Sequence, residues 1–90
     1  MKYLHLAIDL GASGGKVIAG NIQNDKLILS EVNRFSNSPV EVNGISFWNI
    51  LDLYDHIIES IQIAQKKDQK ILSLGIDSWG VDFGLLNENG

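Results

Sequence analysis

The sequence contains no cysteine and a single proline in 90 residues. The lack of cysteine excludes disulfide bonds and thiolate metal sites. No apolar run approaches the roughly 20 residues needed to cross a bilayer. His5 and Asp9 interrupt the apolar start that a signal peptide would need. We therefore expect a cytoplasmic protein with no membrane partner.

Positive charge is also scarce in this chain. Seven Lys and Arg residues stand against eleven Asp and Glu residues, which gives a formal net charge of −4. No stripe of cations is present to replace the counterions of a phosphate backbone, so the composition argues against a nucleic-acid partner. A small nucleotide needs only a local cluster of donors, and net acidity leaves that class of ligand open.

A chain of 90 residues forms one small domain or a piece of a larger one. A domain of this size buries only about 60% of its unfolded surface, which predicts marginal stability. The sequence ends on LLNENG, a turn signal directly after an apolar run, so we expect a partner strand to follow. We therefore interpret the chain as the N-terminal part of a longer protein.

Hydrophobic periodicity predicts an α/β fold in the order β-β-β-α-β-β. Apolar runs bounded by turn signals predict strands at residues 3–9, 16–22, 27–35 and 70–77, with a loop at 36–46 and a last extended run at 81–86. Apolar residues at helical spacing predict a helix with Asn49 as its N-cap, and they are Ile50, Leu53, Tyr54, Ile57, Ile58, Ile61 and Ala64. Two hairpins followed by a parallel return through the helix predict a mixed sheet.

The segment AIDLGASGGKV, residues 7–17, places an acid, a glycine-rich loop and a lysine directly after the first predicted strand. It does not match the Walker loop, which is one residue longer and has a hydroxyl where Val17 stands. The dinucleotide-binding fingerprint is also absent, and no helix follows. The remaining interpretation is a phosphate-binding β-hairpin.

Such a hairpin would use main-chain and side-chain groups together. Consecutive amides from Ala12 to Gly15 can converge on anionic oxygens where glycine allows the turns. Ser13 would add a hydroxyl, Lys16 a positive charge, and Asp9 a ligand for Mg²⁺ that acts through water. This equipment fits phosphoryl transfer, which needs charge neutralisation and positioning. The alternative is a glycine-rich turn without a ligand.

A second motif, GIDSWGVDF at residues 75–83, ends the fourth predicted strand. If that strand lies parallel to the first and beside it, Asp77 and Asp9 emerge at the carboxyl edge of the sheet, where ligands of open α/β sheets bind. Two such carboxylates repel unless a cation or a proton lies between them. Gly80 would let a substrate approach the backbone, with the Trp79 indole as one wall. The alternative is a core tryptophan followed by a turn glycine.

Together, IDLGASGGKV and LGIDSWGVDFGLL resemble the N-terminal segment of the rhamnulokinase family of FGGY carbohydrate kinases. NRFSN at residues 33–37 and FWNILDLY at 47–54 are also similar, so the resemblance covers essentially the whole chain. It implies part of a ribonuclease H-like, actin-type domain, the first domain of an FGGY kinase. It also implies transfer of the γ-phosphate of ATP to the 1-hydroxyl of L-rhamnulose, with Mg²⁺.

The resemblance also implies site residues, carried over by position. The ATP-binding loop corresponds to Ala12, Ser13, Gly14, Gly15 and Lys16, the magnesium position to Asp9, and a backbone contact with the sugar to Gly80. The family usually has arginine at the position of Lys16. A lysine there replaces the bidentate guanidinium fork by a point charge. The family's catalytic base and adenine site lie beyond these ninety residues. The chain alone is therefore predicted to be inactive and to need the remainder of its own chain.

Other functions stay open on the sequence. The chain could belong to another FGGY kinase, acting on fuculose or xylulose, or to an actin- or Hsp70-like domain in which nucleotide drives a change of shape. A sugar-binding regulator without activity is a further alternative, although such a protein should have lost Asp9 or Lys16.

Overall fold

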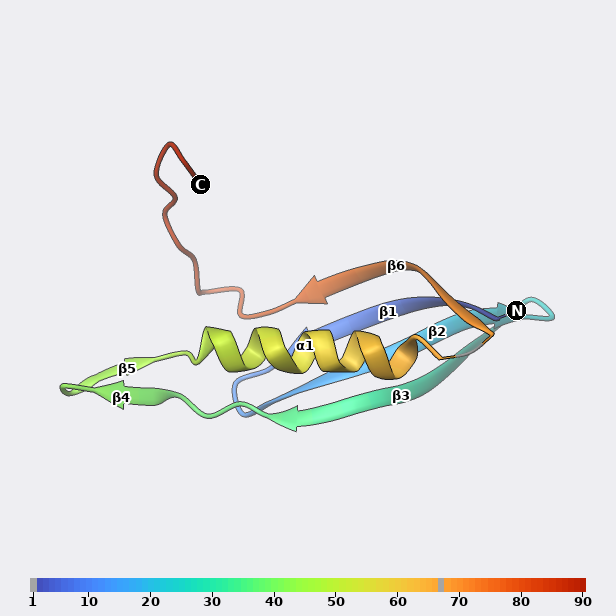
Figure 1. Cartoon of the computed structure of the whole chain (residues 1–90), viewed down its shortest axis with the longest axis horizontal. Helices are drawn as coiled ribbons and strands as arrows, with labels where there is room; N and C mark the ends of the chain where they lie inside the picture. Colours follow the sequence, from blue (N-terminus) through green and yellow to red (C-terminus); the bar gives the residue numbers. More distant parts are fainter. Residues whose placement is uncertain (1, 67) are drawn as a thin grey trace.

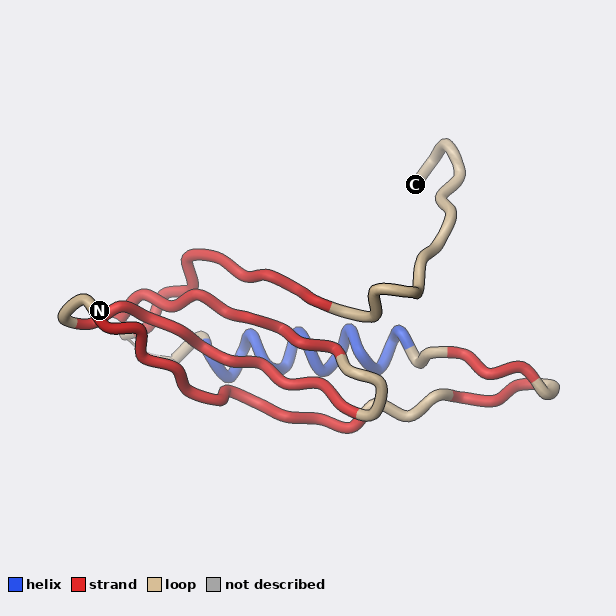
Figure 2. Tube along the Cα trace, turned by 180° about the vertical axis from the view of Figure 1, so that it is seen from behind, coloured by secondary structure: helices blue, strands red, loops and turns tan. Residues whose placement is uncertain are grey.

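The computed structural model describes residues 2–66 and 68–90. Its elements are the strands β1 (Lys2–Leu10), β2 (Gly14–Gln23), β3 (Lys26–Ser36), β4 (Val40–Val42) and β5 (Ile45–Phe47), the helix α1 (Ile50–Ala64) and the strand β6 (Gln69–Asp77) (Figure 1). Four strands form a sheet in the order β3-β2-β1-β6, and α1 covers one face of it (Figures 1 and 2). The α/β class with a mixed sheet is confirmed. Within the described residues, no helix has the length and apolar character needed to cross a membrane.

Local turn chemistry and the crossover rule produce this sheet. Between β2 and β3, Asn24 and Asp25 have positive φ angles of 50° and 63°, the left-handed geometry that suits a tight hairpin. After β3 the chain passes through α1 and returns as β6, which pairs with β1 in parallel. The helix begins after Asn49, whose side chain accepts a hydrogen bond from the Asp52 amide at 3.3 Å. The predicted N-cap is therefore confirmed.

The core lies between α1 and the first three strands. Alternate residues of the strands face the helix and are buried with two helix residues: Leu4, Leu6, Ile8, Val17, Ala19, Phe35, Leu53 and Ala64. Two residues of the predicted helix face, Ile50 and Tyr54, are instead 60% and 64% exposed. The reason is that α1 packs mainly on β2 and β3 and leaves most of β6 uncovered. As a result Leu74 and Ile76 on β6 also remain exposed.

The segment at residues 36–46 differs from the predicted loop. Val40–Val42 and Ile45–Phe47 pair as an antiparallel hairpin, β4 and β5. At its turn, Asn43 and Gly44 have φ angles of 51° and 78°, a conformation that favours an Asn-Gly dipeptide. The Asn-Gly dipeptide was the one sequence signal for this hairpin. The flanking runs of three residues are too short to show the alternation of apolar and polar residues that marks a strand.

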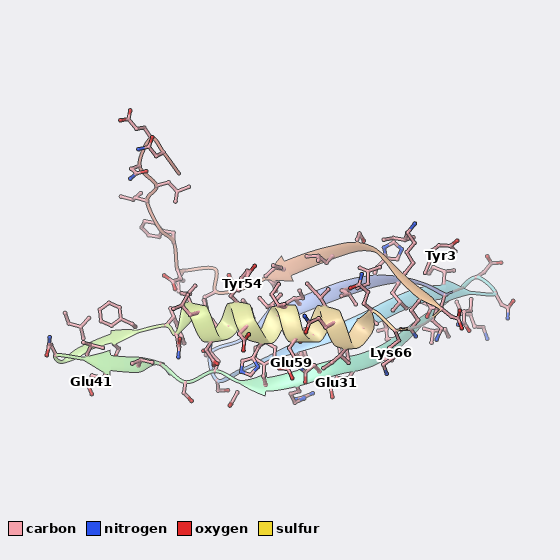
Figure 3. All side chains as sticks on the ribbon, viewed as in Figure 1. Tyr3, Glu31, Glu41, Tyr54, Glu59 and Lys66 are labelled. Atoms are coloured by element: carbon pink, nitrogen blue, oxygen red, sulfur yellow. The ribbon has the colours of Figure 1, made fainter. Side chains whose placement is uncertain are left out.

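The extended run predicted at residues 81–86 is not a strand. Val81, Phe83, Leu85 and Leu86 are between 83% and 95% exposed. Figure 3 shows the side chains of this segment projecting away from the rest of the molecule. A strand needs a neighbour to accept its backbone hydrogen bonds, and the described chain offers none along this segment. The observed order therefore has two extra short strands and lacks the last one.

Candidate functional site

Four charged residues form one row across the sheet, at the end where β1 and β6 finish. Asp9 on β1 is the register partner of both Asp77 on β6 and Lys16 on β2, and Lys16 is the partner of Arg34 on β3. Register partners project from the same face of a sheet. Ile8, Val17 and Phe35, which neighbour the row on β1, β2 and β3, are buried in the core beneath α1, so the row lies on the open face, and all four members are exposed. From β6 to β3, the row consists of two acids, Asp77 and Asp9, followed by two cations, Lys16 and Arg34.

A hollow of about 520 Å³ lies at this end of the sheet. It is lined by Asp9, Ser13, Gly14, Gly15, Lys16, Arg34, Phe35 and Ser36. The structure therefore brings together the predicted acid and four of the five predicted phosphate-loop residues. Asp77 joins them through its pairing with Asp9, whereas Ala12 lies on the turn and does not line the hollow.

The sequence analysis missed Arg34, the second cation of the row. Its guanidinium bonds Oε1 of Glu31 through Nε at 2.9 Å and Nη2 at 2.6 Å. Both side chains are largely in solvent, at 69% and 44% exposed, so this ion pair contributes at most about 1 kcal/mol. Arginine has five N–H donors, and within the described residues the others have no partner and could bind another anion. Directly opposed cations such as Lys16 and Arg34 destabilise an antiparallel pair, and an anion between them would remove that repulsion.

The turn between β1 and β2 is shorter than expected. Because β2 already begins at Gly14, only Ala12 and Ser13 of the predicted phosphate loop lie outside a strand. The Gly11 amide donates to the Gly14 carbonyl at 2.8 Å and closes the turn. Among residues 2–66 and 68–90, the amides of Ala12 and Ser13 have no hydrogen-bond partner. The main-chain donors without a partner among the described residues therefore include the tip of the turn, whereas β2 from Gly15 onward lies between β1 and β3.

Gly15 has a packing role that the phosphate-loop interpretation did not include. A Cβ atom at this position would overlap Cε2 and Cζ of Phe35 and lie 3.2 Å from Cδ2. The Phe35 ring is 7% exposed and is stacked on His56, with ring centroids 4.6 Å apart and planes inclined by 6°. Glycine is therefore required at this position for the close approach of β2 to the ring.

The donor set on the acidic side fits Mg²⁺ in a mixed coordination shell. Asp9 and Asp77 lie on neighbouring strands, which are about 4.8 Å apart in a sheet. Mg²⁺ in phosphate-transfer sites takes one or two carboxylates together with phosphate oxygens and water. In the part of the chain that the structure describes, no group of three or more His, Cys, Asp or Glu residues could hold a metal alone. The site therefore suits an ion that arrives with a polyphosphate.

Trp79 and Gly80 lie after β6 and do not line the hollow. The Trp79 indole is half-buried and stacks on Trp48, with ring centroids 4.2 Å apart and planes inclined by 7°. This contact joins the segment after β6 to the residue that precedes the helix N-cap. Gly80 is exposed, and a Cβ atom there would meet nothing within 4 Å. Its backbone is therefore open to approach.

Comparison with known proteins identifies relatives along the whole chain. A rhamnulokinase of Oceanobacillus iheyensis is 47% identical over 89 residues, which is 99% of this chain and 19% of that protein. The rhamnulokinases of Bacteroides thetaiotaomicron and Bacillus subtilis are 44% and 34% identical over 100% and 97% of this chain. The chain spans about a fifth of the length of these curated relatives. No protein-family model matches it.

Proposed function

We propose, from the premise that this chain is a relative of the rhamnulokinases along its whole length, that it is the N-terminal part of an ATP-dependent sugar kinase. Its sugar substrate would be L-rhamnulose, phosphorylated at the 1-hydroxyl. The observation that carries the proposal is the row of two acids and two cations at one end of the sheet. Beside this row lies a turn in which the amides of Ala12 and Ser13 have no partner in the described part of the chain.

The cationic half of the row would bind the polyphosphate of ATP. Phosphoryl transfer requires positioning and charge neutralisation and little covalent chemistry from the protein. Lys16 and Arg34 line the hollow and supply two positive charges, and Ser13 supplies a hydroxyl beside them. Lys16 binds as a point charge, whereas the planar fork of Arg34 can bond two oxygens of one phosphate.

The acidic half of the row, Asp9 and Asp77, would hold Mg²⁺. When bound, Mg²⁺ neutralises phosphate charge and orients the transferred group. The two carboxylates lie on adjacent strands at the carboxyl edge of β1 and β6, the edge where ligands of open α/β sheets bind. Asp9 is the register partner of Lys16, so the carboxylates that would hold the metal adjoin the cations that would bind phosphate.

The sugar would approach the segment after β6. Gly80 leaves its backbone accessible because no atom lies near a Cβ at this position. Trp79 offers a flat aromatic wall, and its stacking on Trp48 holds the ring in place. Asp77 lies two residues earlier in the sequence and would supply a carboxylate.

The remainder of the enzyme would complete the site. The catalytic base and the adenine contacts would come from outside these ninety residues, so the isolated chain would not turn over substrate. We further propose that the whole domain has the ribonuclease H-like, actin-type fold of FGGY kinases, works in the cytoplasm and binds no nucleic acid. The α/β sheet and the scarcity of cations support these extensions.

A ketose panel assayed with the full-length enzyme tests the proposal. L-Rhamnulose should give the highest kcat/KM with ATP and Mg²⁺, and Asp9→Asn should lower kcat/KM about 100-fold or more. The matched control is Asp25→Asn in the β2–β3 turn, where asparagine tolerates the φ of 63°. A preference for fuculose or xylulose would indicate another FGGY kinase. Slow ATP hydrolysis that no sugar accelerates would indicate an actin- or Hsp70-like domain.

A further inference from the structure

We infer that Asn37 is a positioning residue for the phosphate-binding turn, a role that rests on the proposed function. Asn37 follows β3 and is 26 positions from Gly11 in the sequence. The turn between β1 and β2 nevertheless lies beside the segment that leaves β3 (Figures 1 and 2). The Asn37 backbone amide donates to the Ser13 carbonyl at 3.1 Å, and Nδ2 donates to the Gly11 carbonyl at 3.1 Å. One residue thus holds a carbonyl at each end of the turn.

These two hydrogen bonds determine where the turn's amides point. A peptide group is planar, and its C=O and N–H point in opposite directions. With the Gly11 carbonyl bound to Asn37, the N–H of Ala12 is directed away from Asn37. The N–H of Gly14 is directed away from it for the same reason, because Asn37 binds the carbonyl of Ser13. The two hydrogen bonds therefore fix the orientation of both peptide groups relative to Asn37.

No other contact described in this turn does the same work. The Gly11 amide bonds the Gly14 carbonyl and so closes the hairpin, but that bond leaves the carbonyls of Gly11 and Ser13 free. Ala12 is exposed and has no partner for its amide among the described residues. Two residues without regular structure would otherwise sample several conformations. Asn37 selects one conformation before the anion arrives.

Packing alone does not account for an asparagine at this position. Asn37 is 4% exposed, and among the described residues its Oδ1 is buried without a hydrogen-bond partner. An unpaired buried acceptor is unfavourable, and a leucine of similar size would avoid it. The feature that leucine cannot supply is the Nδ2 donor to Gly11. The side chain is therefore explained by its hold on the turn.

The test compares Asn37→Leu with Asn21→Leu in the full-length enzyme. Asn21 is also buried, at 8% exposed, but lies near the other end of β2, away from the turn. Asn37→Leu should raise KM for ATP and the calorimetric Kd for Mg·ATP about tenfold or more, since small displacements of positioning groups have large effects. KM for the sugar should not change, and the melting temperature of the variant reports any general structural effect. Asn21→Leu should leave both nucleotide constants at their wild-type values.

Each outcome separates the inference from the proposed function. If wild-type enzyme binds Mg·ATP and Asn37→Leu binds it equally well, the positioning role is wrong even though the kinase assignment stands. Equal losses of nucleotide affinity in both variants, or a parallel rise in the KM for sugar, would show a general structural effect and would also overturn it. Wild-type enzyme that binds Mg·ATP but phosphorylates no sugar would refute the kinase, while the Kd comparison would still test Asn37. Wild-type enzyme that binds no nucleotide would refute both.

Discussion

Replacing Gly15 by alanine should destabilise the chain, because the added methyl group would clash with the ring of Phe35. The added Cβ would overlap the Cε2–Cζ edge of Phe35. That ring cannot simply swing away, because it is 7% exposed and stacked on His56. Overpacking of this kind costs about 1–3 kcal/mol of unfolding free energy. In a domain of this size each kcal/mol lowers Tm by roughly 4–8 °C.

Urea denaturation followed by far-UV circular dichroism measures this loss. The matched control is Gly75→Ala on β6, where a Cβ atom would meet nothing within 4 Å. That substitution removes conformational freedom from the unfolded chain and should change stability by less than about 1 kcal/mol. Combining Gly15→Ala with Phe35→Leu should relieve the clash. The double variant should then be less destabilised than the sum of the single variants by about 0.5–3 kcal/mol.

Two results would refute this reasoning. The first is a Gly15→Ala variant that unfolds at the same urea concentration as Gly75→Ala. The second is strict additivity between Gly15→Ala and Phe35→Leu, which would mean that the two positions do not interact. Either result would mean that Gly15 is not needed for packing against Phe35.

Three further outcomes are expected. Lys16→Ala should raise KM for ATP about 10- to 100-fold in steady-state assays of the full-length enzyme, because it removes a charged hydrogen-bond donor. Lys16→Arg keeps the charge and should keep KM within a few-fold of wild type. An equal rise of KM in both variants would contradict the charge argument. Ser60→Ala should lower the free energy of unfolding, measured by urea denaturation, by about 1–3 kcal/mol, because Asn33 Nδ2, which lies 3.1 Å from the hydroxyl, loses its buried partner. The double variant Ser60→Ala with Asn33→Leu should recover part of that loss. No recovery would contradict the pairing. The ninety-residue chain alone should show no phosphorylation of L-rhamnulose in a coupled assay, and measurable turnover would overturn the assignment of the base to the rest of the enzyme.

The sequence alone predicts the order of the main elements because their signals are local. The hairpin turn, the helix with its Asn49 cap and the parallel return of β6 are all confirmed. The acids at the ends of β1 and β6 could be paired in advance, since parallel neighbours end at the same edge of a sheet. Relatedness to rhamnulokinases could be predicted for a similar reason, because short contiguous motifs carry it.

Only the tertiary structure decided which cation faces Lys16. A regular hairpin whose register is set by the turn pair Gln23↔Lys26 would place Asn33 opposite Lys16. A register shift between Val17 and Ile18 moves β3 by one residue, so that Arg34 is the partner. A one-residue shift exchanges the two faces of a strand.

Asn37 illustrates the same limit for the turn. Nothing in the local sequence of residues 11–14 indicates that a side chain from beyond β3 holds the carbonyls of Gly11 and Ser13. That contact exists because β2 and β3 pair along their full length and deliver the end of β3 to the turn. The sequence alone indicated most of the groups that the proposed site would use, but not Arg34. The pairing of distant strands determined how those groups are ordered, because register is set by the sum of contacts along the sheet.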